Sequence, residues 1–227
     1  MLRRNRQPSS TSSGSGAETM RALVYGDCAL DDWPSGDTAD QGEPWDSFVE
    51  ARTALQQGNV DASRQVWLGI TTMPDIESRH VLQAWHFLRL HGVEPPDDEA
   101  RQVLGGVVEV PVAGKHDLLA AYADGSVRYL NHGGDVAAVE PSADLPKVSQ
   151  LIGIYLAMAD NIARVAGTWD QPSLPPVPPG HGRVMALTPG GLRFGQGPEE
   201  QLRAQQMPRD MLDAATLLLQ QVVAAST

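Results

Sequence analysis

Two of the residues best suited to chemistry in this chain stand at a spacing that metal centres use. Glu77 and His80 are three residues apart, so on a helix both side chains project to one side, as in carboxylate-bridged di-iron bundles. Such a centre needs a second Glu-x-x-His pair, and the sequence contains none. His80, His86 and His91 also lack the four-residue spacing of a two-histidine zinc site. We therefore expect no metal here and interpret Glu77 and His80 as a surface pair.

A second candidate group is His132, which is followed by Gly133-Gly134-Asp135. Imidazole titrates near neutral pH and can act as an acid or a base, but no nucleophile or acid partner is identifiable nearby in the sequence. A turn between two strands is the simpler explanation of the glycines, which are common there for conformational reasons. The sequence thus predicts no catalytic residue. If a pocket forms, we expect it to be lined by four residues: Trp85, His116, Tyr129 and His132.

Three further signals have structural explanations. Gly190-Gly191 and Gly195-Gln196-Gly197 resemble a phosphate-binding loop, but Pro198-Glu199-Glu200 removes an amide donor and adds two negative charges. The proline-rich stretch 168–180 contains no Arg or Lys, which favours a spacer over a ligand of SH3-like modules. Cys28 has no adjacent histidine or cation to activate its thiol. We therefore expect no cofactor.

Composition excludes several classes of protein. The net charge is -11 and no basic stripe follows residue 19, so nucleic acid binding is not expected. No apolar run reaches the roughly 20 residues that span a bilayer, so no membrane association is expected. The single cysteine fits a reducing compartment and a cytoplasmic location. Residues 7–16 lack the apolar core of a signal peptide, and residues 1–19 are expected to be a dispensable tail.

The elements that must position these residues begin with a helical segment. Residues 1–44 are expected to form a disordered basic tail and an acidic linker, and residues 45–105 a helical subdomain. Residues 51–62, with Gly58-Asn59 as a helix stop, resemble the helix-turn-helix of a tetratricopeptide unit. Because no second copy follows at a period near 34, this resemblance implies one antiparallel helix pair.

Two more helices are expected before the sheet. The first runs from Asp75, as its N-cap, to Gly92, and the second is a short helix from Pro96 to Gly105-Gly106. Trp67 and Trp85 are expected to pack inside the helical bundle.

Residues 106–227 are expected to form a sheet domain. Alternating apolar residues predict six strands and two long helices, and the strands flank Asp124-Gly125, the centre of a two-residue hairpin turn, and Pro189-Gly190. The strands are 107–112, 118–123, 126–131, 136–140, 184–188 and 192–194; the helices are 145–166 and one opened by Pro208. The sequence therefore predicts an α+β fold in which a mostly antiparallel five- or six-stranded sheet, covered by two helices, follows a helical segment. This order resembles profilin-like or roadblock-like domains in topology.

The function expected from these features is a non-enzymatic protein-interaction or assembly module, whose partner is another protein. The alternative is a small-molecule-binding protein or hydrolase with a pocket between the helical segment and the sheet. An exposed apolar patch would favour the first function. A deep pocket with convergent polar groups of shifted pKa would favour the second.

Overall fold

The computed structural model describes residues 15–34, 41–140, 144–169, 171 and 174–225. The elements before the sheet are α1 (Ser15–Tyr25), a 3-10 helix (Leu30–Asp32), α2 (Trp45–Gln56), α3 (Val60–Thr71) and α4 (Ser78–Leu90). The rest are β1 (Gly105–Val112), β2 (Lys115–Tyr122), β3 (Val127–Leu130), β4 (Val136–Val139), α5 (Pro146–Val165), β5 (His181–Thr188), β6 (Gly191–Pro198), α6 (Glu199–Ala204) and α7 (Gln206–Ala225). None of the described helices is long and apolar enough to cross a membrane.

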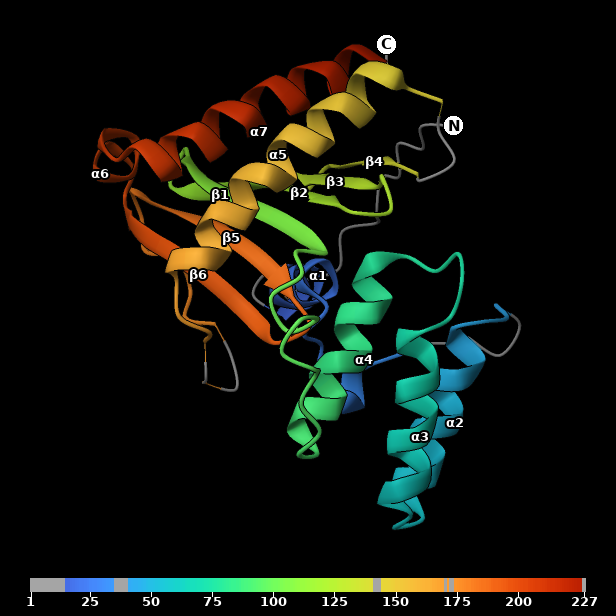
Figure 1. Cartoon of the computed structure of the whole chain (residues 1–227). Helices are drawn as coiled ribbons and strands as arrows, with labels where there is room; N and C mark the ends of the chain where they lie inside the picture. Colours follow the sequence, from blue (N-terminus) through green and yellow to red (C-terminus); the bar gives the residue numbers. More distant parts are fainter. Residues whose placement is uncertain (1–14, 35–40, 141–143, 170, 172–173, 226–227) are drawn as a thin grey trace.

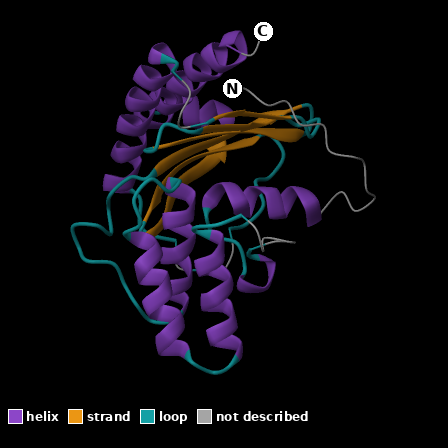
Figure 2. Cartoon of the chain, turned by 90° about the vertical axis from the view of Figure 1, so that its right-hand side faces the viewer, coloured by secondary structure: helices purple, strands orange, loops and turns teal. Residues whose placement is uncertain are grey.

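The centre of the fold is one sheet. In the described part of the chain it has six strands in the order β4-β3-β2-β1-β5-β6, and every neighbouring pair is antiparallel. Helices α5 and α7 lie side by side across one face, while α2, α3 and α4 lie on the other side of the sheet (Figures 1 and 2). The expected α+β class, with a helical segment ahead of an antiparallel sheet, is confirmed.

Alternation along the strands separates two cores. On β1, Val108 faces α5 and α7, whereas Val107 faces α1. Helix α5 approaches β1 so closely that a Cβ on Gly106 would lie 2.9 Å from the Tyr155 ring. On the opposite face, which we call the α1 face, Tyr122 donates a hydrogen bond to the Val24 carbonyl at 2.6 Å. The N-terminal helix is therefore bound to the sheet through the second core.

A third core fills the helical part, α2 to α4. Asn59 caps α3 by accepting a hydrogen bond from the Ala62 amide, and Ser63 Oγ donates to the Ala51 carbonyl where α2 and α3 touch. The expected helix pair is present. Trp67 and Trp85 are both buried in this core, so the prediction that they pack inside the bundle is confirmed.

Residues 20–34 contribute to these cores, although we expected a tail and a loose acidic linker there. Tyr25, Cys28 and Trp33 are all buried. Residues 1–14 of the expected tail and residues 35–40 of the expected linker lie outside the described residues. The backbone around Cys28 is held by Gln83 of α4, whose amide accepts from the Cys28 N–H at 2.9 Å and donates to its carbonyl at 3.0 Å.

The Asp-Gly hairpin has a longer loop than the expected two-residue turn. Residues 123–126 separate β2 from β3, and Gly125 has a positive φ of 89°, typical of a type I turn followed by a glycine bulge. The loop also joins the two halves of the molecule, because Asp124 accepts hydrogen bonds from the Ser78 amide at 2.6 Å and the Ser126 amide at 2.7 Å. It thereby supplies a side-chain acceptor at the start of α4.

Two local predictions were wrong, and one strand was predicted too short. Asp75 is not an N-cap: its φ is 58° and α4 begins at Ser78. Residues 97–101 form a turn and no helix, and the Leu104 amide, which would continue a helix by donating to the Ala100 carbonyl, donates to the Leu187 carbonyl instead. The strand expected over 192–194 is longer, since β6 spans Gly191–Pro198 and includes Gly195-Gln196-Gly197.

Candidate functional site

A cleft of about 520 Å³ lies between the helical part and the sheet. Four separate segments form it: the residues after α1, the end of α4, the connector after α5 and the β5–β6 turn. We call it the α4–β6 cleft; its charged and polar lining includes Asp27, His86, Arg89, Glu94 and Thr168, and its apolar walls include Tyr25, Leu82, Trp169, Leu174 and Leu192.

Asp27 reaches the cleft because α1 ends against α4. Gly26 has a φ of 66°, and a Cβ there would lie 2.7 Å from Leu82 Cβ, so only glycine allows this approach. The Asp27 amide donates to the Ala22 carbonyl at 3.2 Å. Burial raises the pKa of the Asp27 carboxyl to about 7, although the nearby charge of Arg89 opposes this. Near neutral pH this carboxyl is therefore partly protonated.

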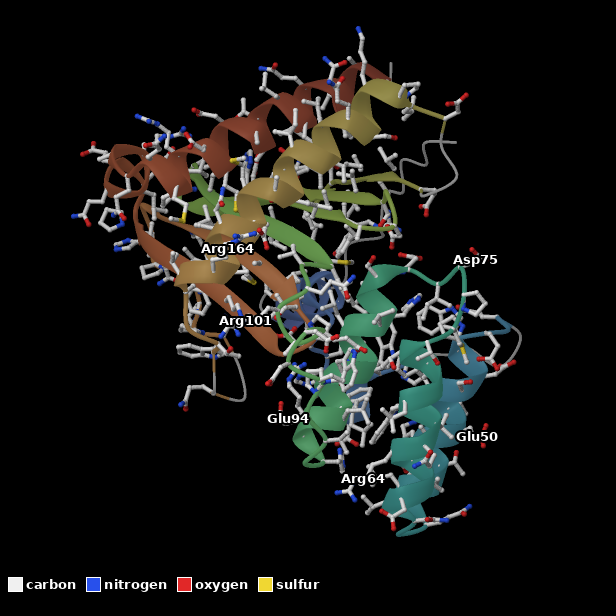
Figure 3. All side chains as sticks on the ribbon, viewed as in Figure 1. Glu50, Arg64, Asp75, Glu94, Arg101 and Arg164 are labelled. Atoms are coloured by element: carbon white, nitrogen blue, oxygen red, sulfur yellow. The ribbon has the colours of Figure 1, made fainter. Side chains whose placement is uncertain are left out.

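Arg89 lies across the β5–β6 turn. Its Nη1 donates to the Pro189 carbonyl, and its Nε is 3.9 Å from the position of a Cβ on Gly191. Burial lowers the pKa of the guanidinium, while the charges of Glu94 and Asp27 act in the opposite direction. Glu94 lies beside the end of α4 in Figure 3. In the cleft, the positive charge of Arg89 thus interacts with two acidic residues, Glu94 and Asp27.

His86 is the third ionisable group of the cleft with a shifted pKa. Burial, helped by the charge of Arg89, lowers the pKa of its imidazole to about 4. The ring is therefore neutral at physiological pH, so it presents one N–H donor and one acceptor nitrogen rather than a charge.

The far wall of the cleft is the connector between α5 and β5. The Trp169 amide donates to the Leu192 carbonyl at 2.8 Å, and the Trp169 ring lies 5.3 Å from the Phe194 ring. A Cβ on Gly191 would lie 2.8 Å from Thr168 Cγ2. The connector is therefore attached to the edge strand β6, and it closes the α1 face of the sheet on that side.

A buried ion-pair network fixes α1 beside the cleft. Glu109 of β1, which is 1% exposed, accepts from the Tyr25 hydroxyl at 2.6 Å and from Arg21 Nε at 3.0 Å. Arg183 of β5, which is 2% exposed, lies 3.4 Å from the same carboxylate and donates to Gln196 Oε1 at 2.9 Å through its Nε. This network positions Tyr25, and with it the end of α1 that carries Asp27.

The four residues expected to line a pocket lie elsewhere. Trp85 is in the core of the helical part, and His116 Nε2 contacts the His181 carbonyl at 3.1 Å near the far end of β1. Tyr129 and His132 do come together, through Asp117 of β2. The carboxylate of Asp117 accepts from the Tyr129 hydroxyl at 2.6 Å and contacts His132 Nδ1 at 2.8 Å.

The Asp117 cluster has the aspartate–histidine contact of a catalytic triad, but no nucleophile hydrogen-bonded to His132 lies among the described residues. Burial opposes ionisation of Asp117, yet the hydrogen bonds from Tyr129 and His132 outweigh it and lower the carboxyl pKa. The His132 amide also donates to Asp117 at 2.7 Å. The contacts of the cluster hold the β3–β4 turn against β2.

The structure also shows the surroundings of His80 and Cys28, two residues considered in the sequence analysis. His80 is 4% exposed and packs on Trp33 and Trp45, so the interpretation of Glu77 and His80 as a surface pair was wrong. Burial raises the pKa of the Cys28 thiol to about 12, which leaves it unreactive. No group of three or more potential metal ligands occurs in the described part of the chain.

The residues of the α4–β6 cleft carry no local sequence signal. Asp27 is one of several acids in a Gly- and Pro-rich stretch, and His86 and Arg89 lie in an ordinary amphipathic helix. Only the packing of segments distant in sequence brings them together. Comparison of the chain with protein-family models, curated proteins and solved structures found no match.

Proposed function

We propose that this protein is a non-catalytic binding protein that takes a small ligand, or a short segment of another molecule, in the α4–β6 cleft. The observation that supports this most strongly is the convergence of Asp27, His86 and Arg89 on one cleft, each with a shifted pKa. Such convergence within a cavity of this size is typical of binding and active sites.

The chemistry of the lining favours binding over catalysis. The described lining residues include no serine, cysteine or lysine, so covalent catalysis through these three nucleophiles has no residue in this part of the site. Thr188, which does line the cleft, donates its hydroxyl proton to the Gly191 carbonyl at 2.8 Å. Apolar walls around a few fixed polar groups suit recognition of an amphipathic ligand.

The experiment that tests this proposal is a fragment screen by ligand-observed NMR with two variants. Leu90, at the rim of the cleft, is 57% exposed, and Leu90→Trp adds bulk there without disturbing a core. Ile154→Trp makes a comparable change on α5, on the other side of the sheet, where Ile154 is 45% exposed. We expect fragments that bind the wild type and Ile154→Trp to lose binding in Leu90→Trp. A screen without such fragments would refute the proposal.

A second candidate function, docking of another protein, is supported by large exposed apolar side chains on α5 and α7. Besides Ile154 these are Val165, Leu217 and Val223, each at least half exposed. A photo-crosslinking residue at position 217 should capture a discrete partner in host cells, whereas one at the exposed position 56 on α2 should not. Equal capture from both positions would argue against a docking face.

A further inference from the structure

We propose that the α4–β6 cleft selects ligands that carry a protonated amine or a guanidinium on an apolar stem, and that Asp27 is the group that binds the cation. This inference rests on the proposed function, since it names the chemistry of the ligand in the same cleft.

The first support is the unmatched state of the Asp27 carboxyl. It lines the cleft, yet no side chain of a described residue donates a hydrogen bond to it, and it forms no ion pair within this part of the chain. By contrast, Glu109 on the same side of the sheet has three partners. The charge of Arg89 and a backbone hydrogen bond stabilise this carboxylate only in part, since burial still raises its pKa. A part-buried carboxylate without a side-chain hydrogen bond or ion pair is costly, and a ligand cation would supply such a partner.

The second support is the order of charges along the cleft. Glu94 and Asp27 both act electrostatically on Arg89, and Arg89 also donates to the Pro189 carbonyl. The charge of Arg89 is therefore already balanced by Glu94, and its guanidinium already has a hydrogen-bond acceptor. Asp27 has no second cation on its other side among the described residues. A cation beside Asp27 continues the alternation of sign, whereas an anion there would face the carboxyl directly.

The walls of the cleft suit the rest of such a ligand. Tyr25 and Trp169 contribute aromatic rings, and Leu174 and Leu192 contribute aliphatic surface, on which an alkyl stem can be buried while its charged end reaches Asp27. The net charge of the chain, -11, also raises the local concentration of cations over that of anions.

The binding of a cation is expected to increase with pH across neutrality. Besides Asp27, the ionisable groups that line the cleft are Arg89, Glu94, Tyr25 and His86. Arg89 stays charged between about pH 6 and pH 8, and Tyr25 and His86 stay neutral. Asp27 loses its proton in this range, so the affinity for an alkylamine should rise several-fold, since the amine itself stays protonated.

The test compares probes of equal length on the full chain by calorimetry: pentylamine, pentanol and pentanoate. The matched variants are Asp27→Asn and Asp32→Asn, because Asp32 is exposed and outside the cleft lining. We expect pentylamine to bind more tightly than the other two probes. Asp27→Asn should weaken it about tenfold, while Asp32→Asn should change it less than about twofold.

A blocked five-residue peptide with one central lysine distinguishes the two sources of such a cation. Tighter binding of the peptide than of pentylamine would assign the cation to a segment of another protein, and equal or weaker binding would assign it to a free amine. Preferential binding of pentanoate, or equal loss in both variants, would overturn the charge assignment and leave the proposed binding function standing. Failure of pentylamine to bind the wild type would also overturn the inference, whereas the binding function fails only if the screen yields no fragment whose binding is lost in Leu90→Trp.

Discussion

At the scale of single residues, Asp27 should make the stability of the protein depend on pH in a direction opposite to that of most carboxylates. Its pKa is raised to about 7 by burial, so its contribution to stability is complete below the unfolded value of about 3.9 and is lost as the pH rises through 7.

The corresponding prediction concerns Asp27→Asn, which keeps the neutral form at every pH. Its free energy of unfolding in urea should match that of the wild type near pH 4. Near pH 8 the free energy of unfolding of the variant should exceed that of the wild type by up to about 4 kcal/mol. Hydration of the part-exposed carboxylate reduces this difference. A difference that is equal at both pH values would show that burial does not control this group.

His80 should make the stability depend on pH in the opposite direction to Asp27. Burial and the charge of Arg79 lower its pKa to about 4, and both ring nitrogens lack a hydrogen-bond partner in the described structure. Because the unfolded state binds a proton on this imidazole more readily, the free energy of unfolding is highest above about pH 6.5 and decreases as the pH falls towards 4.

His80→Phe should therefore stabilise the protein. The gain in unfolding free energy should be about 1 kcal/mol near pH 7, where only the unpaired nitrogens matter, and should grow by about 2–3 kcal/mol near pH 4.5. Urea titrations of the wild type and the variant at both pH values measure this. A gain that does not change with pH would contradict it.

At the scale of elements, the Asp124 loop joins the sheet to α4. Asp124→Ala removes the acceptor for the Ser78 and Ser126 amides and should cost about 2 kcal/mol of unfolding free energy. Asp124→Asn keeps a side-chain oxygen and should cost less than about half of that. Equal losses in the two variants would show that the side-chain hydrogen bonds do not stabilise the joint.

The attachment of α1 depends on the buried pair of Glu109 and Arg183. Glu109→Leu leaves a buried guanidinium without its carboxylate and should cost about 3 kcal/mol or more. The double variant Glu109→Leu, Arg183→Met removes both charges and should be more stable than the single variant. Thermal unfolding of the two proteins checks this, and a double variant that unfolds at a lower temperature than the single variant would contradict it.

At the scale of the whole molecule, the sequence predicted well those elements that are determined by local pattern. The helix expected over 145–166 spans Pro146–Val165, because its apolar spacing is regular and Gly167 follows it. The hairpin around Pro189-Gly190 was also predicted correctly, since both turn residues favour it locally.

The sequence could not predict structure that depends on distant partners. The segment after Pro96 has the residues of a helix start, but its Leu104 amide donates to the Leu187 carbonyl of β5, which is distant in sequence. The cleft is a stronger case, because Asp27 and Arg89 are far apart in the chain and neither belongs to a motif. The sequence-based prediction placed His132 and Tyr129 in a pocket because of their residue types. In the structure these two side chains contact Asp117.

The most direct test of the binding function is amide chemical-shift mapping of the wild type with the strongest fragment from the screen. We expect the perturbed amides to lie in residues 26–27, 86–94 and 188–192, around the α4–β6 cleft. Perturbations confined to the outer surfaces of α5 and α7 would contradict the account, as would a protein whose spectrum no fragment alters.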